Sequence, residues 1–138
     1  MPVLSHNTNN LTFTTANQQW TIEPGVFVAP PGDSLGAVVI PNAADELINN
    51  GNVVVNAGFI SNGAVFVGPA ADGTIVANGS TGSIVGPIGV NIVASNTHVS
   101  NAGSIVGFAG FAVQFSPVAG GQPSLAMLAI FTARPPRS

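Results

Sequence analysis

The sequence predicts an all-β protein, a parallel β-helix or β-solenoid with coils of about 21 to 24 residues and a C-terminal hydrophobic strand. The pentapeptide Gly-Ser-Ile-Val-Gly occurs at 82–86 and again, 21 residues later, at 103–107. A looser copy begins at Asn56, and Asn-Gly or Asn-Ala-Gly recurs between short runs of Val, Ile and Phe. Such self-similarity is typical of a solenoid, in which each repeat packs only against its neighbours.

The N-terminal part, 1–47, alternates short strands with turns. Pro24-Gly25 forms a tight turn between two of the strands, because Pro presets φ and Gly accepts a positive φ. We also expect one helical turn over 42–47, where Asn42 is a suitable cap and the first turn favours the carboxylates of Asp45 and Glu46. The expected strands, which read as alternating or apolar runs, are 11–15, 20–22, 26–28 and 37–40.

The repeat region, 48–116, alternates Val- and Ile-rich strands with corners built from Asn and Gly. Both residues tolerate the left-handed backbone that tight corners need. Equivalent Asn side chains one coil apart can also hydrogen-bond to each other in a ladder. The repeat period drifts, and we expect a loop insertion such as 69–73 to account for the drift.

The C-terminal part, 117–138, contains one hydrophobic strand at 124–132 and a tail in which Pro135 and Pro136 stop further ladder pairing. At 138 residues the chain is long enough to bury a core, so we expect a single domain, 1–138, made of these three parts.

Charged residues make up only 5% of the chain, against about 25% in ordinary soluble proteins. There is no Lys, and the two Arg residues are Arg134 and Arg137. Binding to nucleic acid rests on clustered basic side chains, so the sequence excludes nucleic acid as a partner. A chain with so few basic residues also offers proteases of trypsin specificity almost no cleavage site. This resistance favours an extracellular or cell-surface location, reached by an export route that the sequence does not specify.

Mean hydropathy is high, at +0.48, but the apolar runs are short. The longest, at 125–131, is well below the 18 or so residues of a membrane-spanning helix, so we expect no membrane span. The first residues show neither a charged nor an apolar region of a cleavable signal peptide, and we expect none there.

The chain carries no recognisable catalytic, cofactor or metal motif. Asp45 and Glu46 are adjacent, and neighbouring residues of a strand point to opposite faces, so they make a poor catalytic pair. His6 and His98 without any Cys give no zinc spacing. Asp72 lacks the repeated glycine motif of calcium-binding β-helices and is expected to be a turn residue. We therefore expect no enzyme, no cofactor and no metal.

The segments 19–28, 47–51 and 101–107 resemble the repeats of bacterial secreted β-helix proteins, such as autotransporter and haemagglutinin-like passenger domains. The resemblance extends over about 19–115. It implies a β-helix presented outside the cell, with turns at Asn-Gly.

The ends of a solenoid expose unpaired backbone groups that accept further strands unless they are capped. Because the sequence contains no evident cap, we expect the protein to be a structural subunit whose partner is itself. It would form a filament or sheath by end-to-end stacking, or by exchange of the strand at 125–132 between subunits. In that case Arg134 and Arg137 could meet Asp45 or Glu46 of a neighbour. The expected self-association residues are Leu125, Met127, Leu128, Ile130, Phe131, Arg134 and Arg137.

The alternative is an adhesin-like binding module for surface glycans or for another protein. An exposed aromatic stripe would favour this reading, whereas aromatic side chains in the core would not. The candidates for such a stripe are Trp20, Phe59, Phe66, Phe108 and Phe111.

Overall fold

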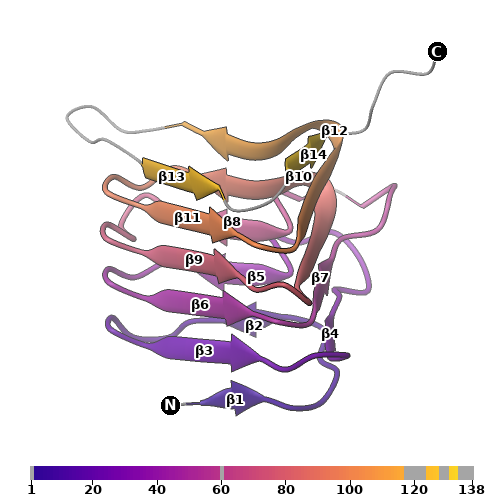
Figure 1. Ribbon diagram of the computed structural model, residues 1–138, viewed down its shortest axis with the longest axis horizontal. Coiled ribbons are helices and arrows are strands. Elements are labelled where there is room, and N and C mark those ends of the chain that lie inside the picture. Colours follow the sequence, from indigo (N-terminus) through magenta and orange to yellow (C-terminus); the bar gives the residue numbers. More distant parts are fainter. Residues whose placement is uncertain (1, 60, 117–123, 128–130, 134–138) are drawn as a thin grey trace.

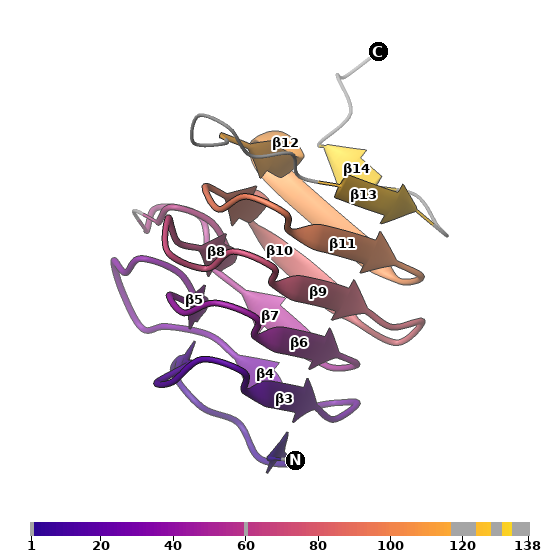
Figure 2. The same ribbon diagram turned by 90° about the vertical axis from the view of Figure 1, so that its left-hand side faces the viewer.

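The computed structural model describes residues 2–59, 61–116, 124–127 and 131–133, the last two segments by their backbone alone. These residues form a parallel β-solenoid, and no helix occurs among them. The coils follow one another in chain order along one axis, with β1 at one end and β12, β13 and β14 at the other (Figures 1 and 2). The predicted fold class is confirmed.

The solenoid has three faces, and each coil between the first and the last contributes a strand to each face in turn. The first face is a six-stranded sheet. The second and third faces are joined, because two long strands turn the corner between them. The first face consists of β1 (Val3–Leu4), β3 (Gln19–Ile22), β6 (Glu46–Asn49), β9 (Ile75–Asn78), β11 (His98–Asn101) and β13 (Ser124–Met127). The second face consists of β4 (Phe27–Val28), β7 (Asn52–Val54), the first parts of β10 (Ser83–Ile92) and β12 (Ser104–Phe115), and β14 (Phe131–Ala133). The third face consists of β2 (Leu11–Thr12), β5 (Val38–Ile40), β8 (Val65–Val67) and the second parts of β10 and β12.

The two copies of the pentapeptide lie side by side in adjacent coils. Ser83 pairs with Ser104, and the register continues to Gly86 and Gly107. Beyond this point the constant spacing of 21 residues would pair Ile88 with Ala109. This alignment is wrong by two residues, since Ile88 pairs with Phe111. The chain of β12 takes up the two extra residues where it turns between the second and third faces.

Coil length varies more than the sequence predicted. Equivalent residues are 23 positions apart between Asn78 and Asn101, but 29 between Asn49 and Asn78. The step between the second and third faces accounts for the net difference: from Val54 to Val65 it takes 11 positions, whereas the equivalent step from Val85 to Val90 takes five. The loop at 55–64, not the predicted insertion at 69–73, is therefore the main cause of the drift.

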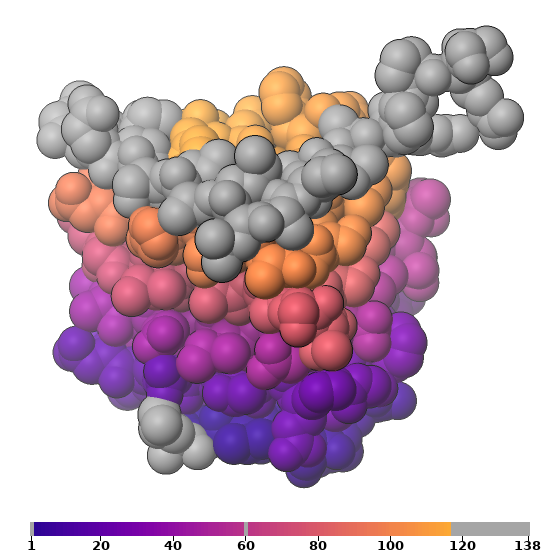
Figure 3. Space-filling model, viewed as in Figure 1, coloured from indigo at the N-terminus to yellow at the C-terminus, as the bar shows by residue number. Residues whose placement is uncertain are grey.

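The interior is a stack of aliphatic side chains, one layer per coil. On the second face Val53, Ile84 and Ile105 are paired neighbours with no exposed surface. Burial of a Val or Ile side chain contributes about 1.5–3 kcal/mol, so these columns supply most of the stabilisation of the fold. The coils that contribute these layers appear at the surface as successive colour bands in the space-filling view (Figure 3).

The predicted Asn ladder is present at the corner between the first and second faces. The Asn49 side-chain amide donates to the Asn78 Oδ1 (2.8 Å), and the Asn78 amide donates to the Asn101 Oδ1 (2.8 Å). All three side chains are buried. Asn56, which the looser repeat aligned with Asn101, is exposed in a loop and takes no part, so that part of the repeat assignment is wrong.

Two other expectations about the elements are wrong. The segment 42–47 is not a helical turn: Ala44 adopts a left-handed turn conformation (φ 58°), and β6 begins at Glu46. Strand pairing with the coils on either side determines this conformation, which local helix signals cannot anticipate. The C-terminal hydrophobic segment is not one strand but two, β13 on the first face and β14 on the second.

Candidate functional site

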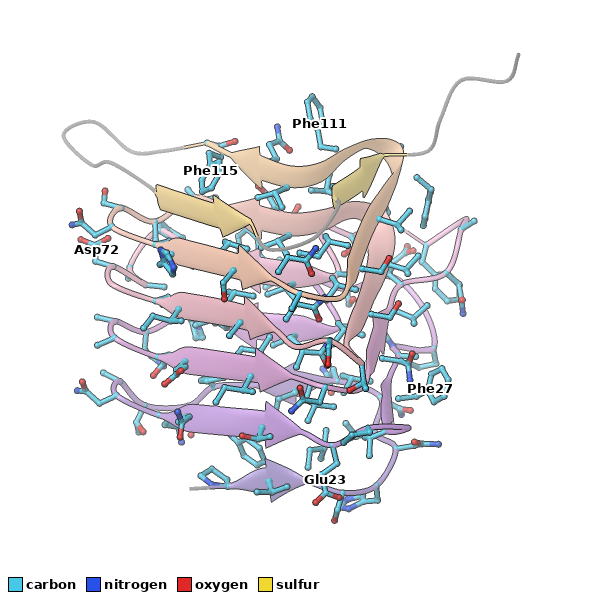
Figure 4. All side chains as sticks on the ribbon, viewed as in Figure 1. Glu23, Phe27, Asp72, Phe111 and Phe115 are labelled. Carbon is cyan, nitrogen blue, oxygen red and sulfur yellow. The ribbon has the colours of Figure 1, made fainter. Side chains whose placement is uncertain are left out.

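The carboxylates and imidazoles do not form a cluster. Asp45 points into the core, whereas Glu46, next to it, lies on the outer side of β6 and accepts a hydrogen bond from the Gln19 side-chain amide. Asp72 lies at a corner loop, where its Oδ1 accepts the Ser95 backbone N–H (3.1 Å). Figure 4 shows Asp72 far from Glu23, which lies near the N-terminal end. Among the described residues no group of three or more potential metal-binding side chains occurs.

Asp45 is the one carboxylate of the described residues that is almost fully buried, with 1% of its surface exposed. Its Oδ1 accepts the Gln18 backbone N–H (2.8 Å). Loss of hydration raises the pKa of Asp45 above its ordinary value, and the hydrogen bond from Gln18 opposes part of this increase. A buried carboxyl group in this position cannot reach a neighbouring molecule, so the expected contact of a C-terminal Arg with Asp45 is wrong.

The aromatic side chains do not form a stripe. Trp20 and Phe59 pack against the core, and Phe66 and Phe108 are partly buried on other parts of the surface. Phe111 alone among the five candidates is largely exposed, at 56%. The sequence did not single out Phe27, which is 47% exposed on the second face, because alternation alone cannot tell which of two apolar neighbours faces inward.

The C-terminal end of the third face is open among the described residues. β14 pairs with β12 only from Ile105 to Gly107, and no described strand covers the part of β12 from Phe111 onward. Val113 and Phe115 stack on the fully buried Val90 and Ile92, yet both remain partly exposed. Figure 4 shows Phe111 pointing away from the molecule at this end.

The N-terminal end also presents strands that pair on one side alone. β1 pairs with β3 and β2 pairs with β5, and no described strand lies on their outer edges. Leu4 and Leu11 are buried in this first coil, whereas Val3 is 49% exposed. Within the described part of the chain, both ends therefore present strand edges that pair with no further strand, and these strands all run in the same direction.

Some of the residues predicted for self-association lie outside the part of the chain that the structure describes. Leu125 and Met127 belong to β13, and Phe131 belongs to β14. Leu128, Ile130, Arg134 and Arg137 lie outside the described residues. Because β13 pairs with β11 and β14 with β12 of the same chain, the segment serves as the last coil of the solenoid.

No family model matches this chain, and neither a curated protein nor a solved structure matches it. No helix that is long and apolar enough to cross a membrane occurs in the part of the chain that the structure describes.

Proposed function

We propose that the protein is a structural subunit that stacks end to end through the two open ends of its solenoid and forms an extracellular filament. The observation that carries this proposal is the edge of β12 from Phe111 to Phe115, which no strand of the described residues pairs with and where Val113 and Phe115, which pack against the core, are partly exposed. Open edges of this kind are templates for further strand pairing.

A second copy of this chain is the partner that best fits this edge. Its N-terminal end presents the edges of β1 and β2, which pair with no further strand among the described residues. All strands are parallel, so a translation along the axis brings β1 and β2 of one copy toward the last coil of another with the same strand direction. Such a contact joins two different surfaces and therefore propagates instead of closing.

The absence of charge in the end strands also supports stacking. β1, β2 and β12 contain no Asp, Glu, Lys or Arg. Soluble β proteins commonly place such residues on open edges to prevent association. Stacking requires less rearrangement than strand exchange, because β13 and β14 already pair within their own chain.

The extracellular location rests on the scarcity of trypsin sites and on the resemblance of the repeats to secreted β-helix proteins. The adhesin-like binding module for a surface glycan or protein is the alternative function, and it would leave the subunits separate.

Negative-stain electron microscopy over a range of protein concentrations tests the proposal. We expect unbranched fibres of the wild-type protein, and only single particles of Phe111→Lys, because a charge at the open edge opposes stacking. Ile75→Lys is the matched control: Ile75 is exposed on the outer side of β9, which has a paired strand on each side. Single particles of the wild type at every concentration, or equal fibre formation by Phe111→Lys, would contradict stacking; particles of twice the subunit mass would indicate a closed dimer instead.

A further inference from the structure

The described strands do not make a whole number of coils, if each strand or bridge on one face is counted as one level. The chain begins on the first face with β1, crosses the second face at Thr8, which bridges to Val28, and reaches the third face at β2. At the other end β13 lies on the first face and β14 on the second, whereas the third face ends with β12. The third face therefore has five described levels, and each of the other two has six.

This difference gives each end of the solenoid a step. Because the chain winds along the axis, each face lies on average one third of a strand spacing beyond the face before it. The step at the N-terminal end is at the first face, where β1 is the lowest level. The step at the C-terminal end is at the third face, which lacks the level that follows β14. The two steps are thus on different faces.

A second copy that is stacked without rotation leaves a gap on the third face. Its β1 lies on β13 and its Thr8 on β14, but its β2 is then two strand spacings from β12. Two spacings are about 9.6 Å, far beyond the reach of an N–H···O bond. Leu11 and Val113 belong to one inward column of this face and would confront each other across the gap. Buried backbone groups without partners and an unfilled space both oppose this arrangement.

A rotation about the axis closes the gap. When the first face of the second copy lies over the third face of the first copy, β1 meets β12, Thr8 meets β13 and β2 meets β14, each at one strand spacing. A rotation by one face in the opposite sense leaves gaps on two faces. Rotation about the axis does not change the strand direction, so the pairing between copies remains parallel.

The residues that follow β14 do not remove this step. Pro135 and Pro136 have no backbone N–H and cannot complete a ladder on β12. The edge of β12 from Phe111 onward therefore needs a strand from another copy.

We propose that successive subunits of the filament are rotated about its axis, so that the first face of each subunit continues the third face of the subunit before it. This inference rests on the stacking proposed above and adds which edges meet, since β1 pairs with β12 across the contact. Seventeen levels, three to a coil and about 4.8 Å per coil, give a rise of about 27 Å and a rotation of about two thirds of a turn per subunit. The same orientation recurs at every third subunit.

Cryo-electron microscopy of wild-type fibres with helical reconstruction tests this symmetry. We expect the rise and rotation given above, the rotation running from the first face through the second to the third. A rise of about 29 Å, or six strand spacings, without rotation would overturn this inference and leave the stacking itself intact. Absence of fibres at every protein concentration would instead overturn the proposed function, and this inference with it.

Cysteine pairs give an independent readout, because the chain contains no Cys. Val3 is exposed on the outer side of β1, and Gln114 lies on the outer side of β12, in register with Asn91. In the rotated stack, Val3→Cys combined with Gln114→Cys places thiols of two subunits on adjacent strands. A short bismaleimide should then link the fibres into a ladder of covalent oligomers, measured by denaturing electrophoresis.

Val3→Cys combined with Ala126→Cys is the matched control. Ala126 is in register with Ser100 and continues the outward column of Val3 on the first face. In the rotated stack these two positions lie on different faces, so the control should remain monomeric. Covalent oligomers of the control, with none from the first pair, would show that the copies stack without rotation and would overturn the inference.

Discussion

At the scale of single residues, two buried polar groups shape the stability of this protein. Asn78 is the centre of the Asn ladder, since it accepts from Asn49 and donates to Asn101, both at 2.8 Å. Asp45 is a nearly buried carboxyl group, and no basic side chain precedes Arg134 in the chain to compensate its charge.

We expect Asn78→Ala to reduce the free energy of unfolding by about 3 kcal/mol or more, because it removes a buried side chain together with its hydrogen bonds to Asn49, Asn101 and the Ser104 carbonyl. Asn56→Ala is the control, since Asn56 is exposed and should change stability by no more than about 0.5 kcal/mol. Urea unfolding followed by circular dichroism measures both values. Equal effects of the two substitutions would mean that the ladder does not contribute to stability.

The raised pKa of Asp45 predicts a pH dependence of stability. A carboxyl group whose pKa is higher in the folded than in the unfolded state favours folding at low pH. This contribution is complete below the pKa of the unfolded chain, about 3.9, and is lost as the pH rises through the raised pKa. The cause is loss of hydration on burial, which outweighs the opposing hydrogen bond from the Gln18 backbone N–H.

Asp45→Asn removes this charge and keeps the side-chain oxygen that accepts the Gln18 N–H. We expect the variant to have a higher unfolding temperature than the wild type at pH 7, and the two temperatures to converge in acid. Calorimetry at several pH values measures this difference. A constant difference at all pH values would show that Asp45 does not titrate in the folded protein within that range.

At the scale of the elements, the long strands β10 and β12 differ from the shorter strands because they pass from one face to the next without a loop. Gly107 lies at the corner of β12, where an added Cβ would overlap the carbonyl oxygen of Phe111. The corner therefore requires glycine for space. The sequence indicated this position only as part of a repeat.

We expect Gly107→Ala to reduce the free energy of unfolding by more than about 3 kcal/mol, because the contact is with backbone that cannot move without breaking the corner. Gly32→Ala is the control: nothing lies within 4 Å of an added Cβ there, and Gly32 is not among the glycines with positive φ. It should leave stability the same or slightly higher. Thermal unfolding compares the two variants, and a mild effect of Gly107→Ala would mean that this corner adapts.

Strand positions were largely predictable from the sequence, whereas corners were not. Short apolar runs such as 20–22 and 37–40 coincide with β3 and β5, because β-branched residues bury well in stacked strands. The prediction of a helical turn at 42–47 was wrong because Asp45 and Glu46 lie on opposite sides of the sheet. Asp45 is buried in the interior, and Glu46 lies on the outer side of β6. Capping preferences describe an isolated helix and carry no information about neighbouring coils.

At the scale of the whole molecule, the proposed association of subunits depends on the two ends of the solenoid. The end strands β1, β2 and β12 lack charged residues, so the proposed stacking would depend on backbone hydrogen bonds and apolar contact. Glu23 lies near the N-terminal end (Figure 4), and the two Arg residues lie outside the described part of the chain.

We expect fibre formation to change little between about 0.05 M and about 0.5 M NaCl, because screening affects charged contacts and hardly affects apolar ones. Added sulfate should instead promote assembly, since it strengthens apolar association. Light scattering at fixed protein concentration follows both effects. A strong loss of scattering with NaCl would show that charged residues, with the two C-terminal Arg residues foremost, hold the subunits together.

The sequence by itself determined the class of fold, the pairing of the two pentapeptide copies and the Asn ladder, because these follow from local repetition and from the conformational freedom of Asn and Gly. Only the tertiary structure decided which residues stack in each coil, the shift of two residues that pairs Ile88 with Phe111, and the division of the C-terminal segment into β13 and β14. It also revealed that no strand of the described residues covers the edge of β12 from Phe111 onward, and that Asp45 is buried. The reason is physical: burial and hydrogen bonding at each position depend on the coils above and below, and loops of variable length hide those neighbours from any reading along the chain.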